Sequence, residues 1–155
     1  MIDVDIKNLA REIEVITNRN GYNYEITLGF DWFKNCPSLK HFQDALKAAY
    51  NEINADELKM TTALADDFWY TVNHTFDYRG GQGSGLKFEN NDEVILKSKQ
   101  DEYKAYLNQL INKDSHFYTF QELKGIPGYP VRWSYRYIID NGNGDYLLIF
   151  GSASD

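Results

Sequence analysis

The sequence has few cysteines, prolines and basic side chains, and it has no long apolar run. Cys36 is the only cysteine, so a disulfide within the chain is excluded. No stretch of about 18 apolar residues is present, and no basic segment followed by an apolar one opens the chain. We therefore expect no membrane span and no secretory signal. A lone cysteine with neither feature predicts a cytoplasmic protein with a reduced thiol.

Low proline and moderate glycine exclude the fibrous and disordered classes. The 155 residues include 3 Pro and 11 Gly, with 43% hydrophobic and 25% charged residues. These proportions are typical of a soluble globular protein rather than of collagen, a low-complexity chain or a disulfide scaffold. The length is that of one ordinary domain. We therefore expect a single domain over residues 1–155.

Basic residues are outnumbered, and the imbalance is concentrated in the first half. The chain has 16 Lys and Arg against 23 Asp and Glu, a formal charge of −7. Residues 1–78 hold 7 basic and 13 acidic side chains, a difference of −6, whereas residues 79–155 hold 9 and 10, a difference of −1. Nucleic-acid binding needs a basic surface, which the first half lacks. An acidic surface favours a cationic partner and accelerates its encounter, although it also serves simply to keep a protein soluble.

Motifs for catalysis or cofactor binding are missing. The glycine-rich segment 80–85 is not followed by the Lys-Ser or Lys-Thr pair of a phosphate-binding loop, so a flexible surface loop is the better interpretation. His41, His74 and His116 do not share a metal-ligand spacing. We therefore expect no catalytic residues, no metal and no cofactor, and a binding role is favoured over an enzymatic one.

Hydrophobic periodicity predicts three helices and several strands. Apolar residues recur every three or four positions over 2–17, 38–53 and 92–112, which indicates amphipathic helices. In the first of these, Glu14 falls on the wet side. Strict alternation over 22–30 and 68–78 predicts two strands, the second with a large aromatic face.

The remaining segments give a weaker signal, apart from the closing one. Residues 56–64 fit a short helix or a strand, residues 86–88 a brief strand pairing, and residues 114–130 an irregular segment. A hairpin closes the chain, because alternating residues flank Asn141–Gly144, whose Asn and Gly tolerate positive φ.

Together these elements predict an α+β fold. We expect a mainly antiparallel, twisted sheet of four to six strands, about three helices packed on one face, and a β-hairpin at the end. The order of the elements resembles that of nuclear-transport-factor-2-like folds. That resemblance implies a curved sheet and a pocket lined by helices.

Aromatic residues are in excess, at 15% of the chain. Tyr and Trp beside carboxylates are typical of binding hot spots, because their rings give a large contact area with a polar end. The alternative is that the rings fill the core and the acids surround it. On the first interpretation, the predicted partner-binding residues are Asp31, Trp32, Asp66, Asp67, Trp69, Tyr70, Asp77 and Tyr78.

The hypothesis that follows is an acidic protein-binding module. Its specific form is an immunity or antitoxin protein that neutralises a cationic bacterial toxin, such as a nuclease, by covering the toxin's active surface. The alternative is a small-molecule binder or enzyme whose pocket is lined by Tyr70, His74, Tyr135 and Tyr137. The oligomeric state is open.

A weaker third interpretation is nucleic-acid binding at the hairpin. Arg132 and Arg136 are four positions apart, so on a strand, where side chains alternate with a period of two, they point to the same face. Lys124 precedes them in the sequence. The patch is thin, because Asp140 and Asp145 flank it. Two arginines on a strand are more often simply a solvated face.

Overall fold

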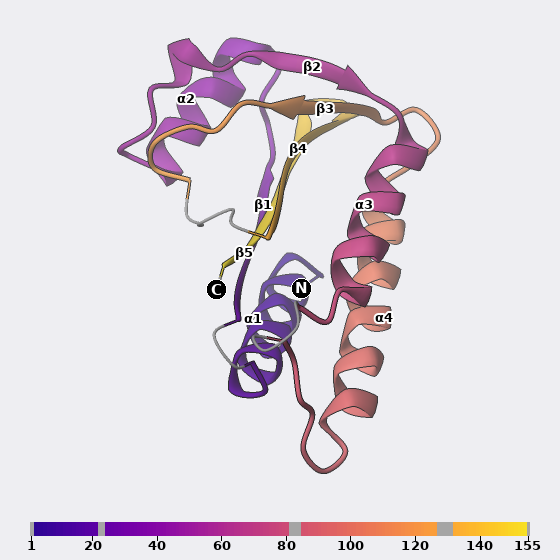
Figure 1. Cartoon of the computed structure of the whole chain (residues 1–155). Coiled ribbons are helices and arrows are strands. Elements are labelled where there is room, and N and C mark those ends of the chain that lie inside the picture. The colour runs from indigo at the N-terminus through magenta and orange to yellow at the C-terminus, as the bar shows by residue number, and fades with distance from the viewer. Residues whose placement is uncertain (1, 22–23, 81–84, 127–131, 155) are drawn as a thin grey trace.

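The chain folds into a five-stranded antiparallel sheet with α-helices on both of its faces (Figure 1). The computed structural model describes residues 2–21, 24–80, 85–126 and 132–154. Within them the elements are α1 (Ile2–Arg19), β1 (Glu25–Phe33), α2 (Leu39–Ala49), the 3-10 helix η1 (Ala55–Glu57), β2 (Met60–Ala63), α3 (Ala65–Asp77), α4 (Asp92–Leu110), β3 (His116–Phe120), β4 (Trp133–Gly142) and β5 (Asp145–Ser154). The predicted α+β fold with a closing hairpin is confirmed.

The sheet has the strand order β1-β5-β4-β3-β2, with every neighbouring pair antiparallel. The hairpin of β4 and β5 lies at its centre, so β1 and β2 form its two edges. The turn between β4 and β5 uses the positive φ angles expected of it, 82° at Gly142 and 55° at Asn143. Figure 1 shows the strong twist that turns β2 and β3 away from β1 and β5.

Alternating side chains of the central strands build two separate cores. Tyr137, Ile139 and Ile149 face α1, α3 and α4, whereas Ile138 and Leu148 face α2 and the segment after β3. Three helices therefore share one face, but they are not the three that were predicted: α2 lies on the other face, and α3, predicted as a strand, takes its place. Phe42 anchors α2 there, because its fully buried ring stacks on Tyr146 at 4.5 Å between centroids.

The strand predicted over 68–78 is wrong, because this segment is the helix α3. Its aromatic and β-branched residues satisfy a period of two and a period of 3.6 at once, so alternation alone cannot separate the two structures. The helix buries Phe68, Val72, Thr75 and Phe76, which lie on one helical face. Two acidic residues in the first turn also suit the positive end of a helix dipole.

Residues 114–130 are not irregular throughout, because β3 lies within them. This strand is held between β2 and β4, and such a position depends on partners distant in the sequence. The part of this prediction that covers residues 127–130 lies outside the described residues.

The ambiguous segment 56–64 contains both structures, the end of η1 and the strand β2. The brief pairing expected at residues 86–88 is confirmed by a bridge between Gly21 and Leu86. Most of the glycine loop, residues 81–84, lies outside the described residues.

Candidate functional site

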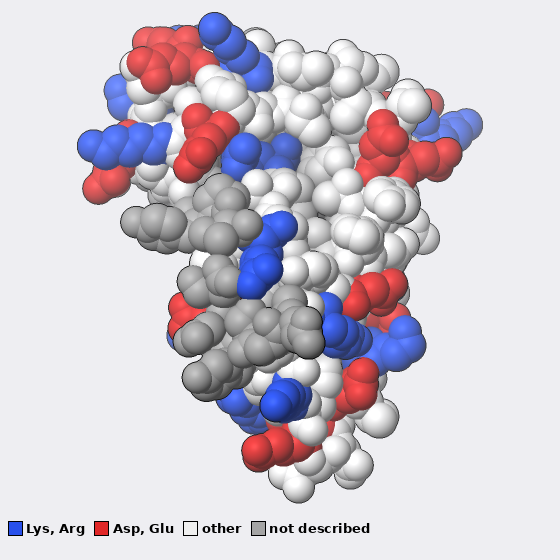
Figure 2. Space-filling view, viewed as in Figure 1, with Lys and Arg blue, Asp and Glu red and all other residues white. Residues whose placement is uncertain are grey.

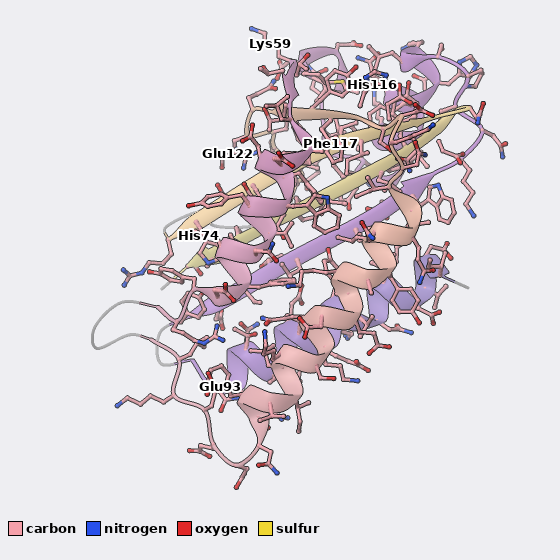
Figure 3. The ribbon with its side chains drawn as sticks, turned by 90° about the vertical axis from the view of Figure 1, so that its right-hand side faces the viewer. Lys59, His74, Glu93, His116, Phe117 and Glu122 are labelled. Atoms are coloured by element: carbon pink, nitrogen blue, oxygen red, sulfur yellow. The ribbon has the colours of Figure 1, made fainter. Side chains whose placement is uncertain are left out.

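Helix α3 carries half of the predicted partner-binding residues on its exposed side. Asp66, Asp67, Tyr70 and Asp77 are all exposed, and with His74 they form a surface that we call the α3 outer face. Positions 66, 70, 74 and 77 lie at intervals of four, four and three, so the helix itself brings them together. Figure 3 shows His74 on the side of α3 that faces away from α4.

Tyr70 is the large exposed aromatic residue of the α3 outer face. Its side chain is 70% exposed, and its ring stacks on that of His74, with centroids 5.7 Å apart and planes 11° apart. The stack restricts the rotation of an otherwise free ring, so less entropy is lost when a partner covers it. An ordered, exposed tyrosine is a typical anchor of a protein interface.

The three carboxylates of the α3 outer face form no ion pair with any residue that the structure describes. Asp66 and Asp67 lie in the first turn of α3, where helix stability alone accounts for them. Asp77 is the last residue of α3, where the helix dipole disfavours a negative charge. Arg79 offsets the negative end there by donating to the carbonyl of Phe76 at 2.8 Å.

Acidic side chains are visible near the start of α3. Figure 2 shows them at the upper right, the position of that end of the helix in Figure 1, with basic side chains at their margin. Much of the surface below them is uncharged. The α3 outer face is therefore a mixed acidic and aromatic surface rather than a uniformly negative one.

Trp69 and Tyr78 lie on or beside α3 but do not project from it. Both are half-buried and pack against the core that α3 covers. The ring of Trp69 meets Phe68 edge-on, and the ring of Tyr78 lies 5.8 Å from that of Tyr24. We expected both rings to be exposed, but each is only half exposed. Residues next to the buried positions of a helix lie at the border between its buried and its exposed face.

Asp31 and Trp32 lie elsewhere, on the edge strand β1. Asp31 is bound by the Lys7 ammonium at 3.2 Å and accepts a hydrogen bond from the Tyr50 hydroxyl. Trp32 is half-buried, with the Lys34 ammonium 3.8 Å from its ring centroid. Because α3 follows β2 at the opposite edge, the eight predicted residues do not form one patch.

The four residues of the alternative pocket are not brought together. Tyr135 and Tyr137 are buried beneath the helices, whereas Tyr70 and His74 project from the outside of α3. The Tyr137 hydroxyl lies 3.2 Å from that of Thr71. Burial raises the pKa of Tyr135 well above its usual value, which is the behaviour of a core tyrosine.

The basic patch predicted at the hairpin remains thin. Arg136 is half-buried and donates to the carbonyl of Phe120, while Arg132 and Lys124 are exposed. Among the described residues, no group of three or more His, Cys, Asp or Glu is placed to hold a metal ion. In the same part of the chain, every helix is too short or too polar to span a bilayer.

Sequence reasoning missed a groove of about 670 Å³ between α1 and β1, bordered by Tyr50 and Phe150. Glu14, which was placed on the wet side of its helix, is half-buried there and accepts a hydrogen bond from the Leu28 amide at 2.7 Å. Burial raises the pKa of the Glu14 carboxyl, an effect that this hydrogen bond and nearby Arg11 oppose. No pattern within one helix reveals such a contact, because it depends on which strand lies beside that helix.

Comparison with known proteins identifies a similar fold. The crystal structure of citrus MAF1 superposes on this chain with a TM-score of 0.51 and covers 94% of it, and 98% of the MAF1 chain is matched. The two sequences are 10% identical. No known protein family and no curated protein matches the sequence.

The likeness to MAF1 concerns the fold alone, since one fold commonly hosts unrelated functions. It extends over nearly all of both chains, so the arrangement of helices around this sheet occurs in at least one other protein. The α3 outer face is therefore described by its own residues, a stacked tyrosine and histidine among three exposed carboxylates. It contains no nucleophile paired with a base.

Proposed function

We propose that this chain is a protein-binding module whose α3 outer face docks a cationic protein. The observation that supports this most is Tyr70, an ordered and exposed ring among three carboxylates that have no ion partner among the described residues. Such a ring fills an apolar recess of the partner, while the carboxylates accept charge-assisted hydrogen bonds from Arg or Lys.

The charge of the whole chain supports the same partner class. At −7, it attracts a basic protein over distances comparable to the Debye length, about 8 Å at physiological ionic strength. Long-range attraction accelerates the encounter, and the local face then selects the orientation.

The specific form of the proposal is an immunity or antitoxin protein. A toxin that cleaves nucleic acid must present basic groups to its substrate, and a rigid acidic face of similar charge pattern competes for them. Neutralisation then needs no catalysis by the chain, only coverage of the basic surface.

A capture experiment with matched baits tests the proposal. The chain and its Tyr70→Ala/Asp77→Asn variant are immobilised and exposed to lysate of the native cell, and Glu52→Gln serves as a control because Glu52 is exposed and lies next to α2. We expect a basic protein to be retained by the chain and by the control, and to be lost from the variant and in high salt. A binding partner retained equally by all three baits would contradict the docking face.

The toxin form needs a second measurement. The captured protein is purified, and its cleavage of DNA or RNA is followed with increasing amounts of the chain. We expect complete inhibition at equimolar ratio and weak inhibition by the Tyr70→Ala/Asp77→Asn variant. A captured protein that cleaves neither nucleic acid, or that cleaves equally well when saturated with the chain, rejects this form while leaving the docking face intact.

A further inference from the structure

The strand β1 lies at an edge of the sheet, so one side of its backbone has no neighbouring strand among the residues that the structure describes. The amides of Ile26 and Leu28 point to this free side, because they donate to side chains of α1 rather than to β5. Backbone groups alternate along a strand, so those of Phe30 point to the same side. An unpaired strand edge is a template for another strand.

Helix α1 runs alongside this edge in the opposite direction and covers its first part. Asn18 accepts from the Ile26 amide at 2.7 Å and donates to the Ile26 carbonyl at 3.2 Å. Glu14 accepts from the Leu28 amide at 2.7 Å. Four residues of a helix advance about 6 Å along its axis, and two residues of a strand advance about 6.7 Å. Because these distances are similar, residues 18 and 14 of α1 lie opposite Ile26 and Leu28, the successive residues of β1 whose backbone groups point outward.

The hydrogen bonds between α1 side chains and the outer backbone groups of β1 do not continue to Phe30. Continuing by four places Ala10 opposite Phe30, and an alanine side chain can neither donate nor accept. Within the described residues, the outward amide and carbonyl of Phe30 have no hydrogen-bond partner. The free part of the edge therefore begins after Leu28.

This free part forms the base of the groove of about 670 Å³ noted above, which residues 28–31 line. Side chains of α1 form one wall, and Tyr50 and Phe150 form the other. A groove between a helix and an exposed strand edge is the geometry in which extended peptides add a strand to a sheet. Its volume lies within the usual range of ligand sites.

The charges of the groove indicate which peptide fits. Lys7 is paired with Asp31, and Glu14 is engaged by the Leu28 amide. Arg11 is exposed, and within the described part of the chain it forms no ion pair or hydrogen bond. A carboxylate on the ligand would therefore find on the α1 wall a guanidinium that no described residue holds by a hydrogen bond and that acts on nearby Glu14 only through its charge.

We propose that the free edge of β1 binds an extended segment of a partner protein as an additional strand, with an acidic side chain of that segment facing Arg11. This site lies at the sheet edge opposite the strand that leads into α3, so it does not depend on the α3 outer face.

Peptide titration followed by amide NMR tests this site. The probes are acetyl-Thr-Val-Glu-Val-Thr-amide, the same peptide with Lys in place of Glu, and the Glu peptide with both valines N-methylated. We expect the Glu peptide to shift the Phe30 amide resonance and slow its hydrogen exchange, which in the free protein is faster than that of Leu28. The Lys peptide binds about tenfold more weakly, and the N-methylated one does not protect Phe30.

Charge variants distinguish the groove from general attraction. Arg11→Glu is expected to weaken the Glu peptide about tenfold and to reverse the preference for Glu over Lys. Lys59→Glu makes the same charge change beside β2, at the other edge, and is expected to leave the affinity unchanged (Figure 3). Absence of any Phe30 shift at millimolar peptide would overturn the site. Equal binding of the Glu and Lys peptides, or equal loss in both variants, would overturn the role of Arg11.

Discussion

At the scale of single residues, α3 places a buried and an exposed aromatic residue within three positions of each other. Phe68 is fully buried, with ring centroids 5.0 Å from Tyr137 and 5.4 Å from Phe117, so it joins the helix to the sheet. Tyr70, two residues later, is 70% exposed, and its ring is stacked on that of His74. Aromatic residues on the same helix therefore lie in the core at one position and on the surface at the other, where the proposed function assigns Tyr70 to recognition.

Truncating these two rings is expected to affect the free energy of unfolding to very different extents. Phe68→Ala leaves a cavity under α3 and lowers the free energy of unfolding by about 3–5 kcal/mol. Tyr70→Ala changes it by no more than about 0.5 kcal/mol, because the ring is mostly in solvent. Urea denaturation of both variants measures this, and a Tyr70→Ala loss comparable to that of Phe68→Ala would mean that Tyr70 is a packing residue.

At the scale of elements, the sequence was sufficient where periodicity is unambiguous and insufficient where partners decide. Helix α1 and the hairpin were predicted within a few residues, because local patterning and turn chemistry specify them. Helix α3 was mistaken for a strand, since seven of its residues are aromatic or β-branched and tertiary packing overrides their preference. Strand β3 was missed because its pairing with β2 and β4 is not a local property.

The same distinction applies to the candidate sites. The exposed members of the α3 outer face were found because they are charged or aromatic and close in sequence. The groove at β1 was missed because its defining contacts join residues 14 and 18 to residues 28 and 26. Its decisive feature is that Ala10 has no hydrogen-bonding group, which becomes informative only when α1 is seen beside the strand edge.

Another element-level contact joins the end of α1 to the start of α4. The Arg19 guanidinium donates two hydrogen bonds of 2.7 and 2.9 Å to the Asp92 carboxylate, and the side-chain amide of Asn20 donates to the same carboxylate at 2.8 Å. The hydrogen bonds from Arg19 and Asn20 lower the pKa of Asp92. Asp92 is also the first residue of α4, where a negative charge is favoured.

The Asp92→Asn variant is expected to be less stable than the parent chain at pH 7. A carboxyl whose pKa is lower in the folded than in the unfolded state contributes stability above its unfolded pKa, about 3.9, and loses it as the pH falls through the folded value. The difference in stability between the parent chain and the Asp92→Asn variant should therefore become smaller below about pH 4. Thermal unfolding across pH 3 to 7 measures it, with Asp101→Asn as the control on the exposed side of α4. A difference that stays constant across this range would assign the effect to lost packing instead.

At the scale of the whole molecule, the net charge and its placement make separable contributions to binding. The charge of −7 attracts any basic protein, whichever face it approaches. On the proposed function, the α3 outer face adds a local negative potential at the place where the partner docks. The contribution of the net charge can be separated from that of the α3 outer face by comparing two variants with the same change in net charge, one on α3 and one elsewhere on the surface.

Reversing two carboxylates at either place raises the net charge from −7 to −3, since each Asp→Lys or Glu→Lys change adds two charges. The first variant is Asp66→Lys/Asp67→Lys on α3. The second is Glu52→Lys/Glu57→Lys, at two exposed positions of the segment that follows α2. Stopped-flow association with the captured basic partner is measured at increasing salt. We expect the α3 variant to associate about tenfold more slowly at low salt and with a weaker salt dependence, because the steering potential is concentrated where the partner docks. The association rate of the second variant should fall much less. Equal slowing by both would show that only the total charge matters and that the partner docks away from α3.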